Sequence, residues 1–554
     1  MSGSNRETGL RAPLPLLPLA AISLAWLVLV MVAIFCRPLL PVDETRYLSV
    51  AWEMYRDGDW LVPHLNGATY SHKPPLLFWA IAALWKLFAP LEWMARLVAP
   101  AGGLAALWLT AGAARRMWPE AEFKAIAWMA PLVLLSLTLW TLFTTLTMFD
   151  CLMALWALLA LHATFDWAER RYLRGVLLLA LAVGLGTLTK GPVSLIYALT
   201  PLIAGHICLR PRLRIWYWLG LAAAGVAGGA AIALTWAVPA GVAGGPLYQE
   251  QIFLGQTSGR LVESFAHKRP FWWYLPLLPL LLYPWAWWPP IWRACMGRAG
   301  LRDPRGRLCL VWFLLGLLTF SLISGKQAHY LVPLLPALAL LFARLTFAAD
   351  GGATQQALLP AAFPALGGGI LLVFYALDFG AVTEHDELDA PDWLMTAAPP
   401  LGLALLALAV AGVFAMRLGD RRLAHPPAAL AAFSLGLFLI SHVFGAMAAR
   451  TAYDLAPIAR KVAELQVAGR PVAYIGNYQG QFNYLGRLAH PVAEVRPAAA
   501  LDWARANPRG ALMVLYRMEN FPTGPAPVYR QPKRGRQIAI WDAEQVLAQP
   551  GILQ

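Results

Sequence analysis

Charged side chains are scarce in this sequence. Asp, Glu, Lys and Arg make up 13% of its 554 residues, whereas soluble globular chains carry about 25%. Apolar residues make up 59%, and the mean hydropathy is +0.56. These values exclude a disordered chain and an ordinary soluble enzyme. They predict a polytopic membrane protein.

Cysteine is also rare, with five residues in the whole chain. Each lies in or beside an apolar stretch, and none follows Cys309. No two of them have the spacing of a zinc-binding pair. The sequence therefore predicts neither a disulfide framework nor a zinc site built from cysteine.

Acidic residues are outnumbered, with 30 Asp and Glu against 44 Lys and Arg and a net charge of +14. The basic residues form short clusters between apolar stretches, near 115–124, 170–174, 210–214, 293–307 and 417–422. This pattern is typical of cytoplasmic loops of membrane proteins and not of a nucleic-acid surface. We expect no nucleic-acid partner.

Thirteen stretches are apolar enough to cross a bilayer, which takes about 20 residues. They are 14–36, 93–114, 122–143, 146–166, 173–189, 192–209, 214–239, 271–293, 307–323, 329–347, 356–378, 394–416 and 427–448. A further run at 75–90 is short and is expected to lie in the membrane interface. If this run does not cross the membrane, the basic clusters lie on the cytoplasmic side and the acidic loop at 384–392 lies on the outer side.

This topology places the N-terminus inside and three segments outside. The first outer loop, 37–92, includes the interfacial run, and the second covers 240–270. The third segment is the tail, where helix-like stretches at 454–467 and 498–506 alternate with β-rich runs at 472–475, 511–516 and 537–541. We expect a transmembrane domain over 1–449 and an outer α/β domain over 450–554.

Ionisable residues crowd the first outer loop. One interpretation is a helix start, because acidic residues are favoured near a helix N-terminus. The alternative is a functional site, because charged groups at membrane depth tend to be paired and functional. The residues concerned are Asp43, Glu44, Arg46, Tyr70, His72 and Lys73.

Further polar residues reach the same outer plane from other spans. Asp150 begins the fourth span and Lys190 ends the fifth, although a helix-terminal carboxylate and a snorkelling lysine would also explain them. The others are Arg260 and His267 in the second outer loop, and Lys326 and Tyr330 in a later turn.

Cations from several outer turns suit a phosphate whose lipid tail lies in the bilayer. A nearby carboxylate suits proton abstraction or substrate positioning. This combination favours an enzyme acting on a lipid-linked phosphate over a transporter. A lipid-linked sugar flippase, the rival hypothesis, would need polar residues through the whole bilayer depth, where this sequence is nearly all apolar.

The run from Val42 to Tyr47, VDETRY, resembles the first outer loop of bacterial 4-amino-4-deoxy-L-arabinose lipid A transferases. These belong to the protein O-mannosyltransferase-like branch of the GT-C membrane glycosyltransferases. Other stretches are similar to that family as well, namely Gly58 to Trp60, Lys73 with Pro74, Thr189 to Gly191, His267 to Trp272, and Lys326 with Tyr330. The resemblance implies a GT-C-like fold of about 13 transmembrane helices with a C-terminal periplasmic α/β domain.

The resemblance also implies a reaction. The donor would be undecaprenyl phosphate carrying the aminosugar, and the acceptor a phosphate of lipid A at the periplasmic face of the bacterial inner membrane. Transfer would lower the negative charge of lipid A and give resistance to cationic peptides such as polymyxin. A related transferase that uses another polyprenyl-phosphate sugar on protein or lipid remains the alternative. We expect a monomer surrounded by membrane lipids.

Carried over by position, Asp43 and Asp150 would be the catalytic carboxylates. The residues that hold the donor phosphate would be Lys73, Arg260, Tyr330 and Lys190. The further candidates to line the site are Glu44, Arg46, Tyr70, His267 and Lys326.

His72 departs from the family, whose members often have Glu before this Lys-Pro pair. His72 and His267 could together bind a divalent cation such as zinc, although isolated histidines are usually not ligands. Lys73 and Arg260 could neutralise a departing phosphate without a metal. We therefore expect no required cofactor.

Overall fold

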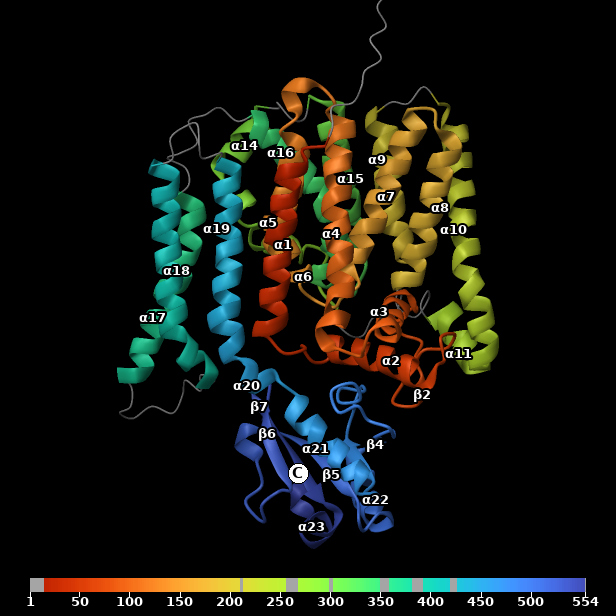
Figure 1. Ribbon diagram of the computed structural model, residues 1–554, viewed down its shortest axis with the longest axis vertical. Helices are drawn as coiled ribbons and strands as arrows, with labels where there is room; N and C mark the ends of the chain where they lie inside the picture. The colour runs from red at the N-terminus through yellow and green to blue at the C-terminus, as the bar shows by residue number, and fades with distance from the viewer. Residues whose placement is uncertain are drawn as a thin grey trace, which may run out of the picture.

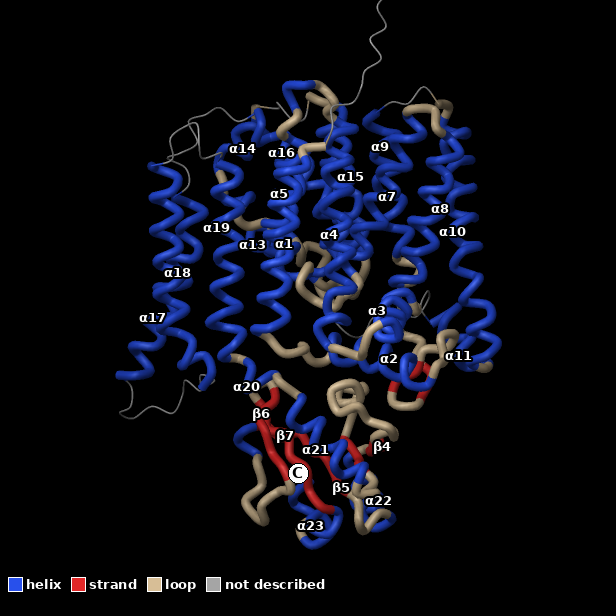
Figure 2. The backbone as a smooth tube through the Cα atoms, viewed as in Figure 1, coloured by secondary structure: helices blue, strands red, loops and turns tan. Residues whose placement is uncertain are grey.

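The protein consists of a bundle of long helices with a small α/β domain at one end of it (Figures 1 and 2). This computed structural model describes residues 14–209, 213–255, 268–297, 302–348, 358–380, 392–418 and 426–553. Residues 256–267 of the second outer loop and nearly all of the acidic loop at 384–392 lie outside these ranges.

Within the described residues, ten of the thirteen predicted spans are long apolar helices. This confirms a multi-pass helical membrane protein. Eight are single α-helices throughout: α1 (Leu16–Cys36), α4 (Glu92–Met117), α7 (Asp150–Ala168), α8 (Tyr172–Lys190), α10 (Ile215–Gly244), α15 (Pro304–Leu322), α17 (Leu358–Gly380) and α18 (Asp392–Leu418). The other two are η5 (Ala328–Leu334) with α16 (Leu335–Ala348), and α19 (Pro426–Ile440) with η7 (Ser441–Ala446).

The other three predicted spans are shorter or broken. The first of them divides into α5 (Ile126–Ser136) and α6 (Thr138–Phe143) at Leu137, whose backbone is extended. The second is α9 (Ser194–Leu209), with 16 residues. The third, 271–293, forms only short pieces such as α13 (Leu278–Leu281) and α14 (Pro289–Met296), because its repeated prolines remove backbone donors and break helices.

The run at 75–90 contains α3 (Leu76–Leu87), which has 12 residues. At 1.5 Å per residue it is about 18 Å long, too short for a hydrocarbon core of about 30 Å. In Figure 1, α3 lies with α2 (Asp43–Asp57) at the end of the bundle that faces the α/β domain. Its position agrees with the predicted interfacial run.

The α/β domain contains a five-stranded sheet in the order β4-β3-β5-β7-β6. Strands β4 (Ala493–Val495), β3 (Val472–Ile475) and β5 (Ala511–Arg517) are parallel, whereas β7 (Arg536–Asp542) and β6 (Tyr529–Lys533) run antiparallel. Helix α21 (Ala456–Val467) covers one face, and α22 (Ala500–Ala506) and α23 (Ala543–Ala548) cover the other. The predicted α/β fold of the tail is confirmed, with β4 and β6 added.

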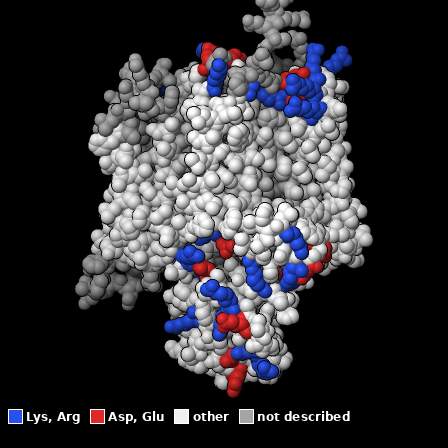
Figure 3. Space-filling model, viewed as in Figure 1, with Lys and Arg blue, Asp and Glu red and all other residues white. Residues whose placement is uncertain are grey.

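Lys and Arg gather at the rim of the bundle opposite the α/β domain (Figure 3). The positive-inside rule then predicts that this rim and the α/β domain lie on opposite sides of the membrane. In a variant without the half-buried Cys36 and Cys295, a membrane-impermeant thiol reagent added from the periplasm should label Asp502→Cys and miss Arg171→Cys. Both sites are exposed, and the reverse pattern would contradict the charge argument.

Candidate active site

Asp43 is the first residue of α2. Its side chain does not cap the helix, because the carboxylate accepts hydrogen bonds from Arg46 at 2.5 Å and from the Tyr47 hydroxyl at 3.2 Å. Burial and the adjacent Asp43 carboxylate raise the pKa of Tyr47 well above its ordinary value, so its hydroxyl stays protonated. The Asp43 side chain remains 51% exposed. Asp43 is therefore oriented by two neighbours and still accessible.

A second carboxylate, Asp150, begins α7 and is fully buried. One oxygen accepts a hydrogen bond from the Lys190 ammonium at 2.6 Å, while the other has no hydrogen-bond partner. Lys190 ends α8, where Gly191 turns the chain with φ 79°. The ammonium also lies 5.1 Å from the centre of the Tyr330 ring. Buried ion pairs of this kind are costly and often functional.

Lys73 and His329 complete the same group. The Lys73 ammonium lies 5.6 Å from the centre of the Phe149 ring, next to Asp150 in the chain. Electrostatic interactions connect Asp150 with Lys73 and His329, and His329 with Asp43. We call Asp43, Lys73, Asp150, Lys190 and His329, with Tyr330 beside them, the polar cluster.

The polar cluster combines two ammonium groups and two carboxylates at one end of an apolar bundle. Ammonium groups bind phosphate oxygens through charge-assisted hydrogen bonds, and these are strengthened where water is partly excluded. The carboxylates can orient a substrate or stabilise positive charge that develops during a reaction. The arrangement suits chemistry on a phosphate at the edge of a membrane.

Tyr70 and His72 approach the cluster along the loop that leads to Lys73. The Tyr70 ring is buried, 6.0 Å from the Phe78 ring of α3 and 5.3 Å from the His72 ring. These contacts hold the loop against α3.

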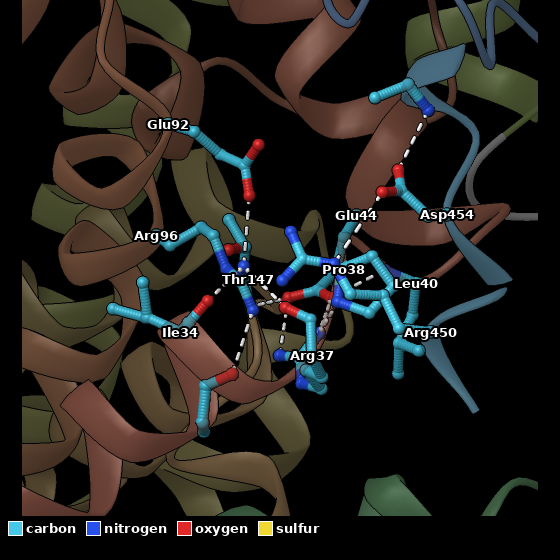
Figure 4. A network of polar contacts seen from close by, with 12 residues as sticks. Ile34, Arg37, Pro38, Leu40, Glu44, Glu92, Arg96, Thr147, Arg450 and Asp454 are labelled. Carbon is cyan, nitrogen blue, oxygen red and sulfur yellow. Dashed lines mark hydrogen bonds and ion pairs between the residues drawn. The ribbon is translucent and has the colours of Figure 1, made fainter. Parts of the chain in front are cut away.

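Glu44 points in a different direction from its neighbour Asp43. It is buried and accepts hydrogen bonds from the Arg37 guanidinium, from Leu40 N at 2.9 Å and from Thr147 N at 2.8 Å (Figure 4). Burial alone would raise the pKa of Glu44, but the Arg37 and Arg96 charges and these hydrogen bonds lower it to about 2. Glu44 therefore joins α2 to the loop that precedes Asp150.

Arg96 of α4 extends this network to the end of α1. Its guanidinium donates to Ile34 O at 2.9 Å and Arg37 O at 3.0 Å, and forms a 3.0 Å ion pair with Glu92 (Figure 4). We call Glu44, Arg37 and Arg96 the buried charge network. Its basic members were not predicted, because single arginines at span ends resemble ordinary interfacial anchors.

The Lys326 side chain binds backbone carbonyl groups. Its buried ammonium donates to Arg269 O at 3.0 Å and Ile323 O at 2.5 Å, which fixes the turn before His329. Two of the three donors of the ammonium are thus engaged with carbonyl groups, and a role for Lys326 in lining the site stays a prediction. Burial lowers its pKa.

Two predicted residues, Arg260 and His267, lie outside the described residues, so the structure does not place them. Among the residues that are described, no three His, Cys, Asp or Glu side chains lie together as a metal site requires. The pairing of His72 with His267 stays a prediction.

Comparison with known proteins supports the resemblance. No family model matches the chain. It is 32% identical over 312 residues to the undecaprenyl phosphate-alpha-4-amino-4-deoxy-L-arabinose arabinosyl transferase 1 of Sodalis glossinidius, covering 55% of each protein. It is 30% identical over 334 residues to the corresponding transferase of Aeromonas salmonicida, covering 58% of this chain and 59% of the relative. The chain thus spans little more than half the length of these curated relatives.

The fold has a solved counterpart. ArnT from Cupriavidus metallidurans in the apo state matches with a TM-score of 0.74 and 21% identity over 96% of this chain and 98% of the other. The crystal structure of the same protein bound to undecaprenyl phosphate matches with a TM-score of 0.71, over 95% and 97%. The chain is therefore a sequence relative of the undecaprenyl phosphate-aminoarabinose arabinosyl transferases and has the ArnT fold.

Proposed function

We propose that this protein is a glycosyltransferase that moves 4-amino-4-deoxy-L-arabinose from undecaprenyl phosphate to phosphate groups of lipid A. The observation that carries the proposal is the polar cluster, which gathers residues from five separate segments at the end of a membrane-spanning bundle. The names of the sequence relatives support the donor and the sugar. The acceptor is inferred from the resemblance of the first outer loop.

The proposed reaction exchanges one glycosidic bond for another. The bond between the anomeric carbon and the donor phosphate breaks, and its electron pair leaves with undecaprenyl phosphate. An oxygen of the lipid A phosphate forms the new bond to the anomeric carbon. Lys73 and Lys190, with Tyr330 and Arg260, would bind the departing phosphate and neutralise its charge.

The acceptor phosphate is largely ionised near neutral pH. Because the acceptor carries almost no proton for Asp43 to remove, Asp43 instead orients the acceptor or stabilises positive charge on the sugar. Asp150 holds Lys190 in place at 2.6 Å. The lysines supply the positive charge that the leaving group requires. A zinc ion on His72 and His267 would have only two protein ligands, fewer than the three or four of typical zinc sites.

We place the reaction at the periplasmic face of the bacterial inner membrane. The support is that α2, which begins at Asp43, lies at the end of the bundle next to the α/β domain (Figure 1), whereas Lys and Arg gather at the opposite rim (Figure 3). A monomer suffices, since every residue assigned to the reaction comes from one chain.

Mass spectrometry of lipid A from cells with and without the gene tests the overall proposal. Aminoarabinose on lipid A should depend on the protein. Unmodified lipid A together with a new sugar on a protein or another lipid would instead indicate a sister transferase.

Replacing Lys73 should weaken donor binding. A charge-assisted hydrogen bond to a partly desolvated phosphate is worth about 1.5–3 kcal/mol, so Lys73→Ala should raise the Kd for undecaprenyl phosphate about tenfold or more. Lys86→Ala is the matched control, because that exposed lysine at the end of α3 stacks on Tyr55. Affinity of the Lys73 variant within twofold of wild type, at fixed salt, would contradict the phosphate site.

A further inference from the structure

One segment of the α/β domain, residues 478–492, docks directly on the loop and helix that carry Asp43. We call it the docking segment. Asn66 of the first outer loop and Val492 exchange two hydrogen bonds, each of 2.8 Å. Asn483 donates to the Glu53 carboxylate at 2.7 Å, and both side chains are buried. Buried polar pairs of this kind fix one relative orientation of the two parts.

Aromatic packing makes the same junction rigid. The Tyr484 ring of the docking segment stacks on Trp85 of α3, with centroids 5.0 Å apart and planes 3° from parallel. The Tyr484 amide also donates to Ser49 Oγ of α2 at 3.1 Å. Any Cβ at Gly480 would lie 2.3 Å from Leu65, so the chain passes too close there for a side chain. The docking segment is therefore held in one position against α2.

Gln479 is the residue of this segment that reaches the candidate site. Its side-chain oxygen accepts a hydrogen bond from the Arg46 guanidinium at 3.1 Å, and the same guanidinium donates to Asp43 at 2.5 Å. Gln479 is in the left-handed backbone region with φ 54°, followed by Gly480 with φ 64°. The turn thus presents the Gln479 side chain toward α2.

We infer that Gln479 is a positioning residue for the reaction at Asp43, supplied by the α/β domain. This inference rests on the proposed function. A guanidinium is planar and donates in fixed directions, so one acceptor on each of its two terminal nitrogens defines its orientation. With Gln479 in place, Arg46 holds the Asp43 carboxylate in one orientation. Without it, the Arg46 guanidinium loses its second acceptor, and the orientation of the carboxylate depends on the Tyr47 hydroxyl and a less constrained Arg46.

Two substitutions separate this role from simple damage to the turn. Gln479→Gly removes the acceptor, and glycine tolerates positive φ without strain. Gln479→Glu keeps an acceptor oxygen at the same reach. Gln549→Ala is the control, because that glutamine follows α23 in the same domain and its side-chain amide donates to Thr523 O at 3.4 Å.

Steady-state transfer should show a fall in kcat of about tenfold or more for Gln479→Gly, since small misplacements of catalytic groups cost up to about 100-fold. The KM for the donor should change less than twofold, and Gln479→Glu should recover most of the rate. In a double-mutant cycle, Gln479→Gly should add little to Arg46→Ala, because both remove the same link. Additive effects would overturn the inference.

Hydrogen exchange gives a readout that does not depend on activity. Amides 43–48 at the start of α2 should exchange faster in Gln479→Gly than in wild type, Gln479→Glu or the Gln549→Ala control. Unchanged exchange would overturn the link between the α/β domain and Asp43. A wild-type protein without transferase activity would refute the proposed function, while the exchange result would still decide the structural link.

Discussion

Asp43→Asn is expected to abolish transfer while leaving the fold intact. The amide keeps the size of the side chain and an acceptor for Arg46 but removes the negative charge. Loss of one catalytic carboxylate should lower kcat by about 100-fold or more. Because the Asp43 side chain is 51% exposed, its ion pair with Arg46 contributes only about 0.2–1 kcal/mol to stability. Lipid A modification in vitro, together with a thermal melt, measures both effects.

Asp57→Asn is the matched control for Asp43. Asp57 ends the same helix, is similarly exposed at 47%, and pairs with Arg56 as Asp43 pairs with Arg46. The two variants should melt alike, and only Asp43→Asn should lose activity. A transfer rate for that variant within twofold of wild type would exclude Asp43 from the chemistry.

Glu44→Gln should have the opposite profile, with a large loss of stability. Glu44 is 1% exposed and compensates Arg37 and Arg96, which are also buried. Removing one partner of a buried charge pair costs about 3–5 kcal/mol, because the remaining charge is left without compensation. Glu92→Gln is the control, since Glu92 pairs with Arg96 at 41% exposure. A Glu44→Gln protein with the same melting temperature as wild type would contradict the stabilising role of the buried charge network.

The pH dependence of the same variant gives an independent check. The pKa of Glu44 is lowered from 4.5 to about 2 in the folded protein. A carboxyl with a lowered folded-state pKa stabilises the protein above its unfolded pKa, and that stabilisation is lost as the pH falls through the folded value. The wild-type advantage over Glu44→Gln should therefore be complete above about pH 4.5 and shrink toward pH 2.

Hydropathy predicted where the chain is apolar but not where its helices are continuous. The stretch at 271–293 is as apolar as the others, yet prolines from Pro276 to Pro290 divide it into short turns. The short α3 could be identified from its length and its charge context. In the tail, β4 was missed because it has only three residues, too few for an alternating pattern.

The candidate site was predictable as a set of residues, but their roles were not. Asp43 and Glu44 are adjacent in the sequence, and consecutive side chains on a helix point about 100° apart. One is therefore exposed beside Arg46 and the other is buried against Arg37, and nothing in the sequence indicates which. Gln479 gave no signal, because its role depends on a contact across more than 400 residues of chain.

The docking segment also has a consequence for the order in which the protein is made. Glu53 receives hydrogen bonds from two amides of its own loop, and its remaining buried partner is Asn483. The ribosome adds Asn483 only after it has synthesised the last span, which ends at Ala446. Until then, the first outer loop lacks the Asn483 amide that bonds to Glu53 and the Tyr484 ring that stacks on Trp85. The loop that carries Asp43 is therefore completed only late in synthesis, by the α/β domain.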